Sequence, residues 1–265
     1  MRIGVIGAGA IGRYLVQAVR SGKAGDHQVV VVGDIIPNGA IDDIPYTTDV
    51  STLPSHGLDL VVEAAAQAAA RQHVVPMLEA GVDVMIMSVG ALADEAFYEQ
   101  VREAARRARR RVYIPSGALG GLDAVKAAAI AGLDSVELIT TKPPIAIKDA
   151  AYFQDHPVDW DAISSPTVVY EGPAIEAVGY FPQNVNVAAV LSLAGLGPRR
   201  TRVRVVADPA STTNQHMVRV RGAFGELEVT LRNKPTPENP KTSWLAALAA
   251  VAMLRRLADP IQLGQ

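Results

Sequence analysis

A glycine-rich motif at residues 7–12 has the spacing of a phosphate-binding turn. It reads G-x-G-x-x-G and lies between an apolar run at residues 2–6 and an amphipathic stretch with helical periodicity. In such a motif the first glycine makes a tight turn, the second lets the backbone approach a pyrophosphate, and the third lets the helix pack on the strand. Free N–H groups and the dipole at the helix start favour the anion. The motif predicts dinucleotide binding by Gly7, Gly9, Ala10, Ile11 and Gly12.

A carboxylate follows the second β-branched run at the position that would contact an adenine ribose. Asp34 lies just after residues 29–32, about 20 residues beyond the glycine motif. A carboxylate there accepts hydrogen bonds from the ribose hydroxyls and repels a 2′-phosphate. Asp34 therefore favours NAD as the cofactor. NADP stays open, because a neighbouring cation such as Arg13 can accommodate the additional phosphate.

Small residues follow two further apolar runs, at residues 58–62 and 82–87. The carboxyl ends of parallel strands meet at one edge of a sheet, where open α/β sheets bind ligands. Small side chains there permit close approach of the ribose and nicotinamide, although helix propensity alone explains them equally well. The residues concerned are Ala64, Ala65, Ser88, Val89 and Gly90.

Among the five histidines, His216 is the candidate acid or base. It opens an alternating strand after the polar segment 211–215, and an unperturbed imidazole exchanges protons near neutral pH. The alternative is a hydrogen-bonded histidine at a strand end. The other four are expected to be solvated or structural. Since the histidines lack ligand spacing and the chain has no cysteine, no metal site is expected.

Two polar segments are candidates for holding the substrate or the nicotinamide carboxamide. Asn184 and Asn186 flank one apolar residue at a helix start, so one amide can cap the helix while the other binds a ligand. A second helix start combines a cation with two hydroxyls and suits a carboxylate, although capping explains the hydroxyls too. Its residues are Lys241, Thr242 and Ser243.

The elements that must position these residues fall into two groups. Up to residue 115, wholly apolar strands alternate with helices, the longest expected at 63–80, which predicts a parallel sheet covered on both faces. Beyond residue 115, strands such as 201–205 and 216–221 alternate between polar and apolar residues. This alternation indicates a largely antiparallel sheet with one face exposed to solvent. The predicted fold is α/β, a Rossmann-type doubly wound parallel sheet with a second α+β domain. We expect a dinucleotide-binding domain at 1–115, completed by a C-terminal helix within 241–265, and a substrate-binding and dimerisation domain at 116–240.

The composition of the chain limits the kinds of partner and location that we expect for the protein. The 265 residues carry 25 Lys and Arg against 27 Asp and Glu, a net charge of -2, so neither nucleic acid nor an anionic membrane is expected as partner. No apolar run approaches the roughly 18–20 residues of a membrane span, and the chain opens without a signal-peptide pattern. A cytoplasmic protein is expected.

These segments together resemble those of the L-aspartate dehydrogenases. The shared motifs, in chain order, are GAGAIG, SVGAL, PSGALGGLDA, FPQNVNVAA, LSLAGLG, ADP, NQH and NPKTS. The resemblance implies a Rossmann domain with an α+β substrate and dimerisation domain, and hence a homodimer. It implies oxidation of L-aspartate to iminoaspartate with NAD or NADP. The product would hydrolyse to oxaloacetate and ammonia, or enter NAD (pyridine nucleotide) biosynthesis.

The resemblance also assigns roles to individual residues. The active-site histidine of the family corresponds to His216, within the NQH motif. Family contacts to the cofactor correspond to Ala118, in PSGALGGLDA, and to Asn186, the second Asn of FPQNVNVAA. No family motif falls on residues 148–176, where substrate preference can depart from the family.

Two other kinds of function remain open. One is another two-domain NAD(P)-dependent reductase, such as a dihydrodipicolinate reductase, whose paired-histidine signature is absent here, or a homoserine dehydrogenase. Sugar-oxidising relatives usually carry Glu-Lys-Pro where this chain has Ser88, Val89 and Gly90. The other is a non-catalytic NAD(H)-sensing protein, which would tolerate loss of His216.

Overall fold

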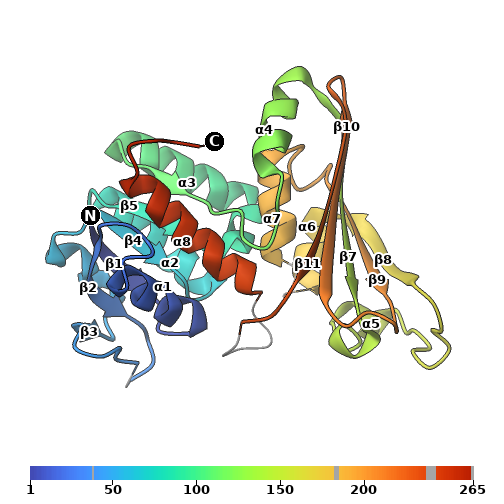
Figure 1. Cartoon of the computed structure of the whole chain (residues 1–265), viewed down its shortest axis with the longest axis horizontal. Helices are drawn as coiled ribbons and strands as arrows, with labels where there is room; N and C mark the ends of the chain where they lie inside the picture. Colours follow the sequence, from blue (N-terminus) through green and yellow to red (C-terminus); the bar gives the residue numbers. More distant parts are fainter. Residues whose placement is uncertain (38, 182–184, 237–242, 264–265) are drawn as a thin grey trace. The chain divides into compact units, whose positions relative to one another are not determined.

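The structure is a computed structural model that describes residues 1–37, 39–181, 185–236 and 243–263 (Figure 1). It divides into two compact units, the first made of residues 1–117 and 246–265 and the second of residues 118–245. Each unit is described by itself below. No helix among these residues is long and apolar enough to cross a membrane.

The first unit is built on a six-stranded sheet in the order β3-β2-β1-β4-β5-β6, with every pair parallel. Because helices cover both faces, the central strands are apolar throughout rather than alternating. Strand order reverses between β1 and β4, which is where open α/β sheets bind their ligands. The strands are β1 (Arg2–Ile6), β2 (Gln28–Gly33), β3 (Tyr46–Thr47), β4 (Leu60–Glu63), β5 (Asp83–Ile86) and β6 (Val112–Tyr113).

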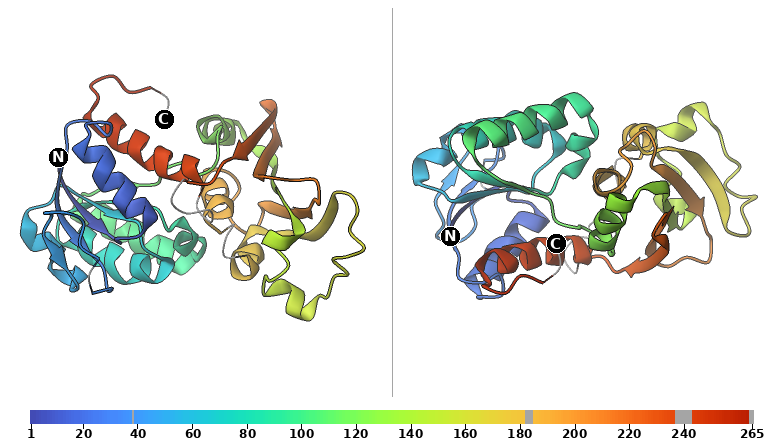
Figure 2. Two further views of the ribbon diagram at one scale, coloured as in Figure 1. Left: turned by 60° about the horizontal axis from the view of Figure 1, so that its bottom comes forward. Right: turned by 90° about the horizontal axis from the view of Figure 1, so that it is seen from above.

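In the part of the chain that the structure describes, four helices cover this sheet. Helices α1 (Ala10–Arg20) and α8 (Trp244–Ala258) run side by side on one face, and α2 (Gln67–Glu79) and α3 (Glu95–Ala108) cover the other (Figure 2). On α1 the side chains of Leu15 and Val19 point into a core that also contains Val251 and Leu254 of α8. Two 3₁₀ segments, η1 (Val50–His56) and η2 (Val89–Ala93), complete the unit.

One predicted helix boundary was wrong. The helix expected at 63–80 begins only at Gln67, because Glu63 still belongs to strand β4, where its carboxylate is buried and hydrogen-bonded. The last helix, expected to be capped by Thr242 or Ser243, begins at Trp244, directly after Ser243.

The second unit contains a five-stranded sheet in the order β11-β10-β7-β9-β8. Strands β7 and β9 are parallel and the other three pairs are antiparallel. Together the two sheets confirm the predicted Rossmann-type fold with a second, largely antiparallel α+β part. The strands are β7 (Leu133–Lys142), β8 (Thr167–Pro173), β9 (Arg202–Ala207), β10 (Asn214–Gly222) and β11 (Gly225–Asn233).

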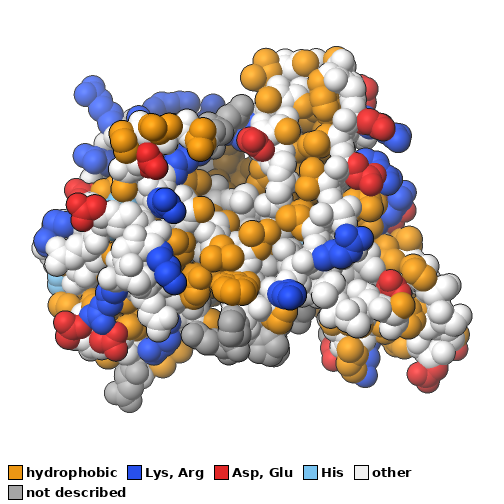
Figure 3. Space-filling model, viewed as in Figure 1, with side chains coloured by type: hydrophobic (Ala, Val, Ile, Leu, Met, Phe, Trp, Pro, Cys, Tyr) orange, Lys and Arg blue, Asp and Glu red, His pale blue; other side chains and the backbone are white. Residues whose placement is uncertain are grey.

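The two faces of this sheet differ in polarity, as the alternating strands predicted. One face contributes Leu138, Val205 and Val218 to a core that also contains residues of the unit's helices. The other carries charges of both signs, in which Glu137 pairs with Arg204 at 3.1 Å and with Arg219 at 3.6 Å. Acidic and basic side chains alternate along the side of the molecule that carries β10 (Figure 3). The helices of this unit are α4 (Leu122–Ala131), α5 (Tyr152–Asp155), α6 (Ala174–Tyr180) and α7 (Val185–Ala194), with the 3₁₀ turn η3 (Pro144–Ala146).

Candidate cofactor pocket and acid/base cluster

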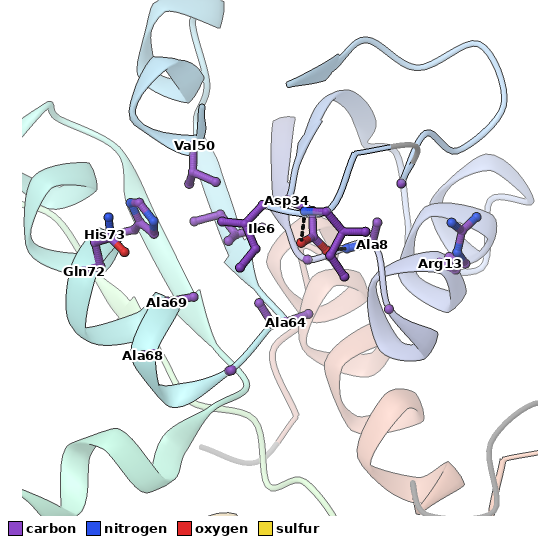
Figure 4. Close-up of a pocket in the computed structure, with 17 residues that line it drawn as sticks. Ile6, Ala8, Arg13, Asp34, Val50, Ala64, Ala68, Ala69, Gln72 and His73 are labelled. Carbon is purple, nitrogen blue, oxygen red and sulfur yellow. Dashed lines mark hydrogen bonds between the residues drawn. The ribbon is translucent and has the colours of Figure 1, made fainter. Parts of the chain in front are cut away.

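A pocket of about 520 Å³ lies in the first unit, at the carboxyl edge of the parallel sheet. Its volume is within the range of small-molecule and cofactor sites. It is formed by the ends of β1, β2 and β4 together with the starts of α1 and α2 (Figure 4). The residues that line it are Ile6, Gly7, Ala8, Gly9, Arg13, Asp34, Ile35, Ile36, Gly39, Val50, Ala64, Ala65, Ala66, Ala68, Ala69, Gln72 and His73.

The three glycines of the loop have different surroundings. A Cβ on Gly12 would lie 1.9 Å from the carbonyl oxygen of Gly7, so this position holds the loop against the helix. Gly7 has a φ of 105°, and a Cβ there would lie 2.7 Å from the carbonyl oxygen of Ala64. Gly9 has no atom within 4 Å of its Cβ position, and it precedes α1 without a side-chain cap. The loop is therefore packed at its ends and open in the middle, where helix N–H groups can receive an anion.

Asp34 is held in place at the pocket. Its Oδ2 accepts a hydrogen bond from the N–H of Ala8 at 2.7 Å, and its Oδ1 accepts one from the N–H of Ile36 at 3.2 Å. Figure 4 shows Asp34 joined to Ala8, with Arg13 of α1 on one side and His73 of α2 on the other. A fixed carboxylate beside the glycine loop is the geometry expected for a ribose-binding acid.

The predicted cofactor residues divide into those that line the pocket and those that do not. The lining residues are Gly7, Gly9, Asp34, Ala64 and Ala65. Gly12 packs beneath the loop, and Ala10 and Ile11 lie in the first turn of α1. Ser88, Val89 and Gly90 are buried after β5, outside the pocket lining. Ala118 and Asn186 belong to the second unit, so their contacts stay predictions.

One side of the pocket is formed by residues that the sequence analysis did not predict as part of a site. Helix α2 contributes Gln72 and His73, and the segment after β2 contributes Ile35 and Ile36. His73 was expected to be solvated or structural; it is mostly buried rather than solvated, and it lines the cavity. Burial lowers the pKa of the His73 imidazole below its ordinary value. The run of alanines before it was the available signal, because it lets α2 approach the sheet edge closely.

Glu63 is a second residue that sequence reasoning missed. Its side chain is 0% exposed and lies at the end of β4, next to the pocket-lining Ala64. Its oxygens accept hydrogen bonds from the N–H of Ala65 at 2.9 Å, the N–H of Ser88 at 3.0 Å and the Oγ of Ser88 at 2.9 Å. The carboxylate thus joins the ends of β4 and β5.

In the second unit, strand pairing brings His216 beside a hydroxyl. His216 on β10 lies directly opposite Thr140 on β7, and its Nδ1 is 3.0 Å from the Oγ1 of Thr140. The imidazole is 5% exposed and the threonine 0%. Thr140 therefore orients the ring through Nδ1, which leaves Nε2 available for another partner.

Lys142 lies on the same face of β7 as Thr140, two residues further along. It is 4% exposed, and among the described residues its ammonium group has neither a hydrogen bond nor an ion pair. Burial lowers its pKa to about 8. Burial also lowers the pKa of His216, and with the positive charge of Lys142 brings it to about 4. A buried cation without a counter-ion is costly, and an anionic ligand beside it would reduce that cost.

The remaining predicted site residues make other contacts or lie outside the described residues. Ala118 accepts a hydrogen bond through its carbonyl from Nδ2 of Asn233, at 3.0 Å, and Asn233 lies opposite Asn214 near the start of β10. Asn186 is exposed on α7, and Ser243 has a buried Oγ for which no hydrogen bond is found. Asn184, Lys241 and Thr242 lie outside the described residues. Within the described residues, no cluster of three His, Asp or Glu side chains could hold a metal ion.

The sequence is similar to known proteins along its whole length. Residues 123–257 match the family model "Aspartate dehydrogenase, C-terminal", and residues 7–115 match "Homoserine dehydrogenase, NAD binding domain". The L-aspartate dehydrogenase of Methanocella arvoryzae is 43% identical over 99% of both chains, and that of Methanosarcina acetivorans is 41% identical over 100% of this chain and 99% of its own. The crystal structure of aspartate dehydrogenase from Thermotoga maritima superimposes with a TM-score of 0.80 at 30% identity, covering 100% of this chain and 99% of that one.

The open position in the glycine loop can be tested with two matched substitutions. Gly9→Ala places a methyl group in empty space at a φ of -74°, so the melting temperature should stay within about 2 °C of wild type. NADH should nevertheless bind about 10-fold more weakly, because the methyl group occupies the path of the pyrophosphate. Gly12→Ala should lower the melting temperature by more than about 5 °C. Unchanged NADH affinity in Gly9→Ala, measured by fluorescence titration, would exclude this loop as the phosphate site.

Asp34→Asn keeps an oxygen acceptor for the Ala8 N–H in the glycine loop and gives up the longer hydrogen bond from the Ile36 N–H. Asp34→Asn removes the negative charge that binds the ribose and repels a 2′-phosphate. We expect NAD⁺ to bind about 5- to 10-fold more weakly and NADP⁺ to bind more tightly. Dissociation constants for both, compared with those of Asp34→Ala, measure the change. Parallel weakening of both cofactors in Asp34→Asn would remove this residue from ribose recognition.

Proposed function

This chain belongs to the L-aspartate dehydrogenase family, and from that premise we propose that it oxidises L-aspartate to iminoaspartate with NAD. The observation that carries the proposal is the buried set of His216, Thr140 and Lys142 on one face of the second sheet. It combines a neutral, oriented base with a cation that has no counter-ion among the described residues. An amino acid with carboxylates complements both groups.

The base acts on the amino group. A hydride can leave Cα only when the nitrogen lone pair is free to form the C=N bond, so the substrate ammonium must first lose a proton. His216 is neutral at pH 7 because burial and Lys142 lower its pKa to about 4, and it receives that proton at Nε2. The Cα–H bond then breaks as the C=N bond forms, which yields the iminium form of iminoaspartate.

The cation binds a carboxylate, and binding strengthens the base. An ammonium group desolvated by the protein gains far more from a substrate carboxylate than a solvated one does. Once the carboxylate neutralises Lys142, the charge that helps lower the pKa of His216 is balanced. The imidazole therefore becomes more basic only when the substrate is present. Lys142 and His216 in this way link substrate binding to proton removal.

The cofactor fits the first unit. The open Gly9 position and the uncapped start of α1 suit the pyrophosphate, and Asp34 suits the adenine ribose of NAD. When bound, the nicotinamide supplies the acceptor for the hydride that leaves Cα. Arg13 also lines the pocket, so NADP remains a proposed second cofactor of lower preference.

Release of ammonia follows the same proton path in reverse. Water adds to the iminium carbon, and His216 transfers protons between the oxygen and the nitrogen until the C–N bond breaks. The products are oxaloacetate and ammonium. Iminoaspartate released before hydrolysis would instead be available for NAD biosynthesis. The homodimer and the cytoplasmic location expected from the sequence stay predictions.

The alternative functions predict different behaviour. A homoserine dehydrogenase or dihydrodipicolinate reductase would act on a substrate without aspartate's combination of an α-amine and two carboxylates. The matched C-terminal family model and the full-length relatives favour aspartate over both. A non-catalytic NAD(H) sensor would have no use for a buried cation that lies near a histidine and pairs with no described residue.

Removal of the base should reduce turnover without affecting the cofactor. His216→Ala is expected to lower kcat for L-aspartate about 100-fold or more, because it removes general-base catalysis. NADH affinity should stay within about 2-fold of wild type. His156→Ala, which removes an exposed histidine of the same unit, serves as the control and should keep full activity. Undiminished aspartate oxidation by His216→Ala would show that His216 is not the base.

Removal of the buried cation should weaken the binding of L-aspartate and make the folded protein more stable. Lys142→Met is expected to raise the KM for L-aspartate at least 10-fold. It should also stabilise the protein at pH 7 by about 1–3 kcal/mol, because a charge that is costly to bury is replaced by an apolar side chain. Thermal unfolding and steady-state kinetics measure the two effects. A destabilised variant with an unchanged KM would contradict the role of Lys142.

The same residue predicts a pH dependence. The folded protein releases the Lys142 proton near pH 8, whereas the ordinary pKa is 10.5. The burial penalty is therefore present below pH 8 and disappears as the pH rises from 8 towards 10.5. Over that interval kcat/KM for aspartate should fall as the cation is lost. Lys142→Arg stays charged, so its alkaline limb should move to higher pH.

A further inference from the structure

Glu63 is a completely buried acid for which the proposed reaction has no role so far. It ends strand β4 at the sheet edge that holds the cofactor pocket, and the next three residues line that pocket. It does not line the pocket itself, so it is not a ligand for the substrate. A fully buried acid is rare unless its charge has partners or a use.

The hydrogen bonds of Glu63 suit an ionised carboxylate. All three come from donors, two backbone N–H groups and the hydroxyl of Ser88. The two N–H groups cannot accept a proton in return, so only the hydroxyl of Ser88 could serve a protonated carboxyl group as acceptor. Burial is the largest influence on the group and raises the pKa of Glu63 above its ordinary value, whereas the hydrogen bonds from Ser88 and Ala65 lower it. These donors stabilise a negative charge beneath the loop after β4.

The topology places this charge under one half of the dinucleotide. Ligands of such sheets straddle the reversal of strand order, here between β1 and β4. Asp34 follows β2 and marks the side of the adenine ribose. A dinucleotide bound in this way would extend its nicotinamide half to the other side, toward the ends of β4 and β5. These are the two strand ends that Glu63 joins through Ser88.

We propose that Glu63 is a specificity-determining residue that makes the pocket bind the oxidised cofactor more tightly than the reduced one. The oxidised nicotinamide ring carries a positive charge and the reduced ring is neutral. A fixed carboxylate in a region shielded from water attracts only the oxidised ring. This inference rests on the proposed binding of NAD. It gives the first unit a role in the direction of the reaction, because the product NADH loses the attraction that held NAD⁺.

The test compares three ligands and two variants by titration calorimetry. Glu63→Gln removes the charge at constant size, and Ser88→Ala removes one donor while the charge stays. ADP-ribose, which lacks the nicotinamide ring, reports the integrity of the rest of the pocket. We expect Glu63→Gln to weaken NAD⁺ about 10-fold and to change NADH and ADP-ribose by less than 2-fold. Ser88→Ala should leave the ratio of NAD⁺ to NADH affinity as in wild type.

The other outcomes separate the possible failures. If Glu63→Gln weakens the binding of all three ligands equally, Glu63 only supports the loop. If it changes the affinity for none of them, the charge of Glu63 does not affect ligand binding. Either result overturns the inference but leaves the proposed function intact. A wild-type protein that binds none of the three would overturn both. If Glu63→Gln does not fold, Glu63→Met provides the neutral variant and Glu63→Asp the charged one. The inference then requires that the ratio of NAD⁺ to NADH affinity falls in Glu63→Met and stays near the wild-type value in Glu63→Asp.

Discussion

The buried ammonium group of Lys142 is the constraint on which the proposed chemistry depends. Among the described residues no carboxylate balances it, and burial lowers its pKa to about 8, so the folded protein carries a cost that an anionic ligand can relieve. The same charge helps to keep His216 neutral. Thr140 completes the arrangement by fixing the imidazole ring. A site that is costly without its ligand and able to bind a carboxylate beside a base is what an amino-acid dehydrogenase requires.

The first unit provides a site in which backbone groups, rather than charged side chains, can bind a large anionic ligand. Gly7 and Gly12 hold the loop by contacts too close for any side chain, which leaves Gly9 and the start of α1 open to a phosphate. Asp34 adds a hydrogen bond that holds the loop from the adenine side. Glu63 has the corresponding position after β4 and joins two strand ends. In the proposed arrangement these two carboxylates, one at the pocket and one beneath it, act on opposite halves of the dinucleotide.

Features of the fold and the site that depend on neighbouring residues could be predicted from the sequence, whereas features that depend on contacts between distant segments could not. The glycine loop, Asp34 and the two sheet types follow from short-range patterns, and the structure has them where they were expected. The link between His216 and Thr140 joins residues 76 positions apart through the pairing of β7 with β10, which no local pattern shows. The position of Lys142 on the same face as Thr140 likewise becomes visible only once strand β7 is defined. Glu63 was assigned to a helix because alanines follow it, and only its buried hydrogen bonds reveal its place in the strand.

The most direct test of the central claim is the rate of NADH formation by the wild-type protein with a panel of substrates. The panel should contain L-aspartate, D-aspartate, L-alanine, L-homoserine and L-malate, each with NAD⁺ and with NADP⁺. The buried cation beside the neutral base predicts turnover of L-aspartate, with NAD⁺ preferred, and rates at least 100-fold lower with L-alanine, which lacks the second carboxylate. No turnover of aspartate, together with turnover of L-homoserine or L-malate, would contradict it.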